Sequence, residues 1–132
     1  MRTRAKICGI TRVEDVHAVA NAGCDAIGFV FYPLSPRHVN LEQAEILIRA
    51  VPAYVQAVGL FVNSHADEIQ DILKTVPLDI LQFHGDETPE QCQAIAQQVG
   101  RRWYKAIQVK PDLDAVAEIQ GYQDAGASAV LL

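Results

Sequence analysis

The sequence lacks any run or stripe of basic residues, and its 11 Lys and Arg are outnumbered by 16 Asp and Glu, for a formal net charge of -5. Nucleic-acid-binding domains concentrate positive charge on one face, so we expect no nucleic-acid partner. No apolar run approaches the roughly 20 residues that a membrane helix needs. No uninterrupted apolar stretch follows the basic residues Arg2 and Arg4, which argues against a signal peptide. We therefore expect no membrane partner.

Cysteine and histidine are scarce, and neither is spaced as metal ligands are. The three cysteines are odd in number and lack metal-ligand spacing: Cys8, Cys24 and Cys92. The four histidines form no HxxxH or similar pair, so we expect no structural metal. Free thiols of this kind are typical of a reducing compartment, which predicts a cytoplasmic protein.

Glycine-rich phosphate-binding motifs are also missing. No GxGxxG fingerprint follows the first apolar segment, and the sequence has no P-loop. A dinucleotide-binding Rossmann fold is therefore poorly supported.

What the sequence does contain is a regular alternation of apolar strands and amphipathic helices over 132 residues, half of them apolar. This length suffices for one α/β domain, residues 1–132, with a real core. The pattern predicts strands at 4–9, 26–31, 55–62, 78–83, 103–109 and 127–132. It predicts helices at 13–22, 41–50, after a cap at Ser64, after a cap at Thr88, and at 112–125. Such alternation forces parallel pairing with right-handed crossovers, either in a barrel or in an open doubly wound sheet.

The segment Lys6-Ile7-Cys8-Gly9 is the end of the first predicted strand. Side chains alternate across a strand, so Lys6 and Cys8 share one face, and a cation near a thiol favours the thiolate. A thiolate at the end of a parallel strand is a candidate nucleophile or general base. The alternative is a buried structural cysteine, since free cysteines are often buried.

Other polar residues gather where predicted strands end, which is where parallel barrels carry their active sites. Gln82 and His84 follow the fourth strand and share a face. His84 is a candidate acid, a donor to substrate, or a core histidine. Asp86 and Glu87, just beyond it, suit the positive end of the next helix.

Arg37 lies between Pro36 and His38 in a loop stiffened by two prolines. An arginine held in this way is able to grip a carboxylate or phosphate with two parallel hydrogen bonds. The alternative is a solvated surface arginine.

Five segments resemble the phosphoribosylanthranilate isomerase family of tryptophan biosynthesis, and they occur in the family's order along the whole chain. They are Lys6-Ile7-Cys8-Gly9, GFVFYPLSPR at 28–37, GLFVN at 59–63, LQFHGDE at 81–87, and AVLL at 129–132. Each is weak alone, and together they are specific.

The resemblance implies a (βα)₈ TIM barrel, of which this chain covers about five βα units and the sixth strand. It implies an Amadori rearrangement, an intramolecular aldose-to-ketose isomerisation of a phosphorylated small molecule that needs no cofactor. Carried over by position, Cys8 is the general base, Arg37 holds the anthranilate part, and Gln82 and His84 line the pocket. Proton abstraction of this kind needs a base that is poised near the working pH.

The resemblance also implies that a catalytic acid follows Leu132 and that the phosphate ligands lie after strands seven and eight. The domain is therefore expected to be truncated at its C-terminus and inactive by itself. The alternatives are a non-catalytic barrel fragment that self-associates, as a homo-oligomer or with its missing half, and an unrelated flavodoxin-like domain.

Overall fold

The computed structural model describes all of residues 1–132 and contains one parallel sheet of six strands. The strand order β1-β2-β3-β4-β5-β6 follows the sequence, and every neighbouring pair is parallel. The strands are β1 (Lys6–Cys8), β2 (Ala26–Val30), β3 (Gln56–Phe61), β4 (Ile80–Phe83), β5 (Arg102–Ala106) and β6 (Ala129–Leu131).

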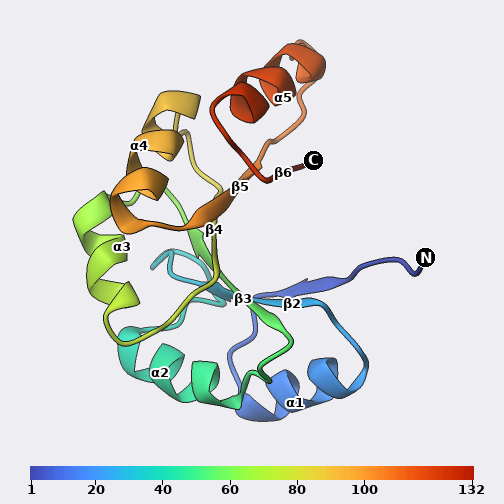
Figure 1. Cartoon of the computed structure of the whole chain (residues 1–132), viewed down its shortest axis with the longest axis vertical. Coiled ribbons are helices and arrows are strands. Elements are labelled where there is room, and N and C mark those ends of the chain that lie inside the picture. Colours follow the sequence, from blue (N-terminus) through green and yellow to red (C-terminus); the bar gives the residue numbers. More distant parts are fainter.

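Five helices connect these strands and lie around the outside of the curved sheet (Figure 1). They are α1 (Val13–Asn21), α2 (Leu41–Ala50), α3 (Ala66–Leu73), α4 (Pro89–Val99) and α5 (Ala115–Asp124). Every helix lies on the same side of the sheet (Figure 1), as expected when consecutive parallel strands are neighbours and crossovers keep the usual right hand. A doubly wound flavodoxin-like sheet needs a reversal of strand order and helices on both faces, so that alternative is wrong.

The two faces of the sheet carry different side chains. The outer face supplies large residues such as Phe29, Leu81 and Trp103, which pack in one cluster with the inward sides of the helices. The inner face carries a small cluster of Ala26, Val58 and Ile80, with Tyr104 against it. The middle of the sheet is thus apolar on both faces, as in buried parallel strands, while Lys6 and Gln82 add polar groups to the inner face.

Local signals placed every predicted strand and helix in the right part of the chain, and the bounds of α2 agree with the prediction. Thr88 caps α4 as predicted, with its Oγ1 accepting from the Gln91 amide at 3.2 Å and Pro89 at the first helical position. The predicted cap at Ser64 is wrong by one residue, because His65 is the N-cap of α3 and its amide donates to Glu68 at 3.4 Å. All six strands and α5 are shorter than predicted.

None of these helices combines the length and the apolar character that crossing a lipid bilayer demands.

Candidate active site

Cys8 ends β1 and lies opposite Gly28 of β2 in the sheet register. Its thiol occupies the space that a side chain at position 28 would need, since a methyl group there would lie 2.8 Å from Cys8 Sγ. Lys6 lies opposite Ala26, two residues back along the same strand pair, so Lys6 and Cys8 share the inner face as predicted. Cys8 is half-buried at the C-terminal end of the strand, whereas the other two cysteines are buried.

Arg37 lies beside Cys8, although 29 residues separate them in the sequence. Its Nη1 donates a hydrogen bond of 2.9 Å to the Cys8 carbonyl oxygen. The guanidinium covers Gly9, whose φ of +84° and lack of a side chain both permit this approach. Within the loop, the Arg37 amide donates to Ser35 Oγ at 3.2 Å. The loop after β2 ends where the Val39 amide donates a hydrogen bond of 2.9 Å to the Val30 carbonyl oxygen.

Gln82 and His84 lie at the end of β4. Gln82 is only 3% exposed, and its Nε2 lies 3.3 Å from His84 Nδ1. The other polar atom of the Gln82 amide, Oε1, is buried without a hydrogen-bond partner. Buried polar groups are nearly always satisfied, so this amide is suited to receive a ligand or water donor.

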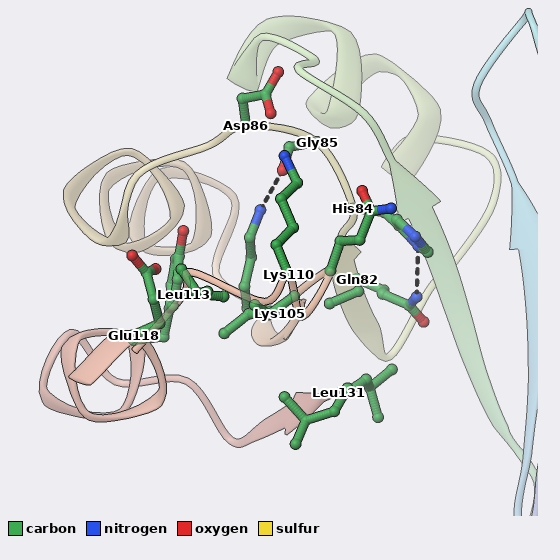
Figure 2. Close-up of a pocket in the computed structure, with 14 residues that line it drawn as sticks. Gln82, His84, Gly85, Asp86, Lys105, Lys110, Leu113, Glu118 and Leu131 are labelled. Atoms are coloured by element: carbon green, nitrogen blue, oxygen red, sulfur yellow. Dashed lines mark hydrogen bonds between the residues drawn. The ribbon is translucent and has the colours of Figure 1, made fainter. Parts of the chain in front are cut away.

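A cavity of about 800 Å³ opens beside these two residues (Figure 2). Its size is in the range of small-molecule sites. The ends of β4 and β5 supply Gln82, His84 and Lys110 to its wall, and Figure 2 shows Lys110 extending toward Gly85. Leu131 of β6 lies on the opposite side of the cavity.

The structure brings the four predicted site residues to one edge of the sheet in two pairs. Cys8 and Arg37 contact each other at the ends of β1 and β2, whereas Gln82 and His84 contact each other at the end of β4. Cys8 and Arg37 do not line the cavity of Figure 2. Register places Cys8, Gly28, Val58 and Ile80 in one row across the inner face, and Gln82 is the next inward residue after Ile80.

The other two cysteines are unlike Cys8. Cys92 of α4 is completely buried, and desolvation raises the pKa of its thiol to about 12. Burial also raises the pKa of the Cys24 thiol, with the nearby Asp25 carboxylate adding to the effect. Of the three thiols, Cys8 is the least buried.

One part of the site was missed by sequence reasoning. Lys105 of β5 and Glu87 form an ion pair of 2.9 Å, and each side chain is 4% exposed. Glu87 was expected to serve the start of α4, and it instead pairs with Lys105 beneath the loop that carries His84. The available signal was a lysine in the middle of the apolar strand WYKAI at 103–107. No group of three or more His, Cys, Asp or Glu side chains lies close enough to hold a metal ion.

A family model of N-(5'-phosphoribosyl)anthranilate (PRA) isomerase matches residues 5–132. The chain belongs to this family. It is 69% identical over 132 residues to the N-(5'-phosphoribosyl)anthranilate isomerase of Acinetobacter calcoaceticus, covering all of this chain and 62% of that protein. The isomerase of a Pseudomonas putida strain is 54% identical over 129 residues, 98% of this chain and 60% of that protein.

Solved structures of the family share the fold. The phosphoribosyl anthranilate isomerase from Thermotoga maritima superposes with a TM-score of 0.87 at 36% identity, over 98% of this chain and 61% of that one. Another phosphoribosyl anthranilate isomerase structure is a complex with reduced 1-(o-carboxyphenylamino)-1-deoxyribulose 5-phosphate. It superposes with a TM-score of 0.82 at 38% identity, over 90% of this chain and 60% of that one. The predicted TIM-barrel class is confirmed, and the chain spans less than two thirds of the length of these relatives.

Proposed function

We propose that the complete natural protein containing this chain converts phosphoribosylanthranilate into the corresponding 1-deoxyribulose 5-phosphate, an Amadori step of tryptophan biosynthesis. The observation that carries the proposal is the half-buried Cys8 at the end of β1, with the Arg37 guanidinium donating to its carbonyl oxygen. Family membership supplies the reaction class. The three unpaired cysteines fit a reducing compartment, so the proposal places the reaction in the cytoplasm.

Cys8 is assigned as the general base. Opening of the furanose ring leaves an iminium at C1′, which makes the C2′ proton acidic. The Cys8 thiolate takes this proton, and the C2′–H electron pair forms the C1′=C2′ bond of an enolamine while the nitrogen becomes neutral. Tautomerisation of the enolamine then gives the 2′-ketone. The proposal leaves the acid that protonates the ring oxygen, and the phosphate ligands, to positions after Leu132.

Arg37 is assigned to the anthranilate carboxylate. Nη1 is held by the Cys8 carbonyl oxygen, and the other guanidinium donors make no hydrogen bond within the chain. A guanidinium anchored through one nitrogen keeps a fixed plane, which favours a second, charged acceptor. This arrangement would hold the aromatic acid next to the base.

Gln82 and His84 are assigned to the wall of the substrate pocket. The unpaired Gln82 Oε1 provides an acceptor, and His84 provides a ring nitrogen at the same cavity. A polar group buried without a partner costs free energy, so a substrate hydroxyl that satisfies it binds more favourably.

The test is the Cys8→Ala variant of the complete natural protein, assayed for isomerisation and for binding of a reduced product analogue. We expect kcat to fall by about 10²–10⁴-fold with analogue binding nearly unchanged, since a general base acts on the chemical step. Cys24→Ala is the matched control, because that thiol is buried just before the start of β2, away from the C-terminal strand ends that carry the site. This variant should keep full turnover. Comparable turnover by Cys8→Ala would refute the assignment and make His84 the next base to test.

A further inference from the structure

The buried pair of Glu87 and Lys105 has no role in the chemistry proposed above, although Lys105 is among the residues that line the cavity beside Gln82 and His84. Register places Lys105 next to Phe83, on the outer face that the helices cover. Its ammonium lies 5.5 Å from the centre of the Tyr122 ring of α5. The Tyr122 hydroxyl donates to the Glu87 carbonyl oxygen at 2.8 Å.

Stability alone is a weak reason to keep two charges in this place. Both side chains have lost their water, and replacing such a pair by apolar residues of similar size is often neutral or stabilising. The hydrogen bonds that the pair makes point to another role.

Together the two charges hold Gly85 by both of its backbone groups. Glu87 Oε2 accepts from the Gly85 amide at 2.9 Å, and Lys105 Nζ donates to the Gly85 carbonyl oxygen at 2.6 Å (Figure 2). Gly85 directly follows His84, so this grip sets the orientation of the peptide that carries the His84 ring. The contact of His84 with Gln82 then depends on it.

The same pair also holds the end of β3. Glu87 Oε1 accepts from the Asn63 amide at 2.7 Å, and Asn63 Oδ1 accepts from the Asp86 amide at 2.9 Å. Asn63 adopts a φ of +52°, which is uncommon for a residue other than glycine. A side chain at position 85 would overlap the Asn63 amide, so the two loops are fitted to each other. The ends of β3, β4 and β5 are therefore joined through one buried ion pair.

We propose that Glu87 and Lys105 are positioning residues that set the orientation of His84 and Gln82 at the substrate pocket. This inference rests on the proposed isomerase function for its kinetic readout. The pair acts through the backbone of Gly85, whose amide and carbonyl groups it holds. A misplacement of pocket groups by about 1 Å is enough to cost about a hundredfold in rate.

The decisive variant is Glu87→Leu combined with Lys105→Met in the complete natural protein. It leaves no unpaired buried charge, so we expect thermal stability to be retained. We expect kcat/KM to fall by about 10–100-fold, because the Gly85 peptide is no longer held. Lys105→Arg, which keeps the charge and the donors, should recover part of the loss. The control is Val76→Ala, a fully buried position away from the strand ends, which lowers stability and should leave kcat/KM within about twofold.

A double variant with unchanged kcat/KM, or one that loses no more activity than Val76→Ala, would overturn the inference. If the double variant does not fold, Lys105→Met alone is compared with Val76→Ala at temperatures where both are fully folded, and the same criterion applies.

A readout independent of turnover separates this inference from the proposed function. NMR signals of the His84 ring and the Gln82 side-chain amide, with the nuclear Overhauser contact between them, should change in the double variant and stay constant in Val76→Ala. A wild-type protein without isomerase activity would refute the proposed function and leave these signals to decide the positioning role. Unchanged signals in the double variant would refute the positioning role whatever the activity.

Discussion

Gly28 lies opposite Cys8 in the sheet, and the space left by its missing side chain is occupied by the Cys8 thiol. Sγ would be 2.8 Å from a methyl group at position 28, a distance well inside van der Waals contact. A glycine inside a strand ordinarily weakens it. Here the glycine determines the position that the thiol of the proposed base occupies.

Gly28→Ala should therefore reduce catalysis without removing the thiol. The new methyl group displaces Cys8 Sγ, and we expect kcat to fall by about tenfold to a hundredfold, as expected for a displacement of reacting groups on the order of 1 Å. Steady-state kinetics of the complete natural protein measure this change. Gly59→Ala is the matched control, because its methyl group would also be crowded, but by Leu78 and Phe61 on the outer face. A larger kcat loss in Gly59→Ala than in Gly28→Ala would show that general strain, and not thiol position, explains the result.

Arg37→Lys should raise KM more than it lowers kcat. Lysine keeps the positive charge but lacks the guanidinium fork, which in the proposal donates to a substrate carboxylate while Nη1 donates to the Cys8 carbonyl oxygen. The loss of one hydrogen bond to a charged group corresponds to about tenfold to a hundredfold in substrate affinity. Titration with substrate across the KM range measures the effect.

Arg49→Lys on α2 controls for the exchange itself, since Arg49 is in the last turn of a helix on the outer side of the sheet. If Arg37→Lys left KM unchanged and lowered only kcat, Arg37 would act on the base and not on the anthranilate.

The free energy of unfolding should decline as the pH rises from about 9 toward 12. The folded protein holds the Cys92 and Tyr122 protons tightly, because burial raises the pKa of each group to about 12. In the unfolded chain these groups ionise nearer their ordinary values, a thiol at about 8.5 and a phenol at about 10. Between the two limits the unfolded state binds fewer protons, so stability is present at lower pH and is lost as pH rises.

Urea unfolding at several alkaline pH values measures this slope. Cys92→Ala removes one of the two groups and should give a shallower decline than the wild type. Val76→Ala, another truncation in the same core cluster, should lower stability at every pH and leave the slope unchanged. Equal slopes in Cys92→Ala and the wild type would show that the Cys92 thiol is not protected from ionisation.

Much of this protein is determined by short stretches of sequence. The apolar strands and the Thr88–Pro89 helix start depend on residues a few positions apart, so local patterns were enough to predict them. The placement of Cys8 and Gln82 at strand ends on one face follows from the two-residue period of a strand. The specific roles proposed for these residues in the isomerisation come from the resemblance to the isomerase family.

Other features were decided only by the tertiary structure. The sequential strand order excluded the doubly wound alternative. This order depends on the packing of all five strand–helix–strand connections against the sheet. Arg37 meets the Cys8 carbonyl oxygen across 29 residues, and Lys105 meets Glu87 across 18. The end of β3 is joined to Glu87 across 24 residues. The residues around one partner of such a contact do not indicate which distant residue the other partner is. Burial and hydrogen bonding between distant segments exist only once the sheet has brought the strand ends together.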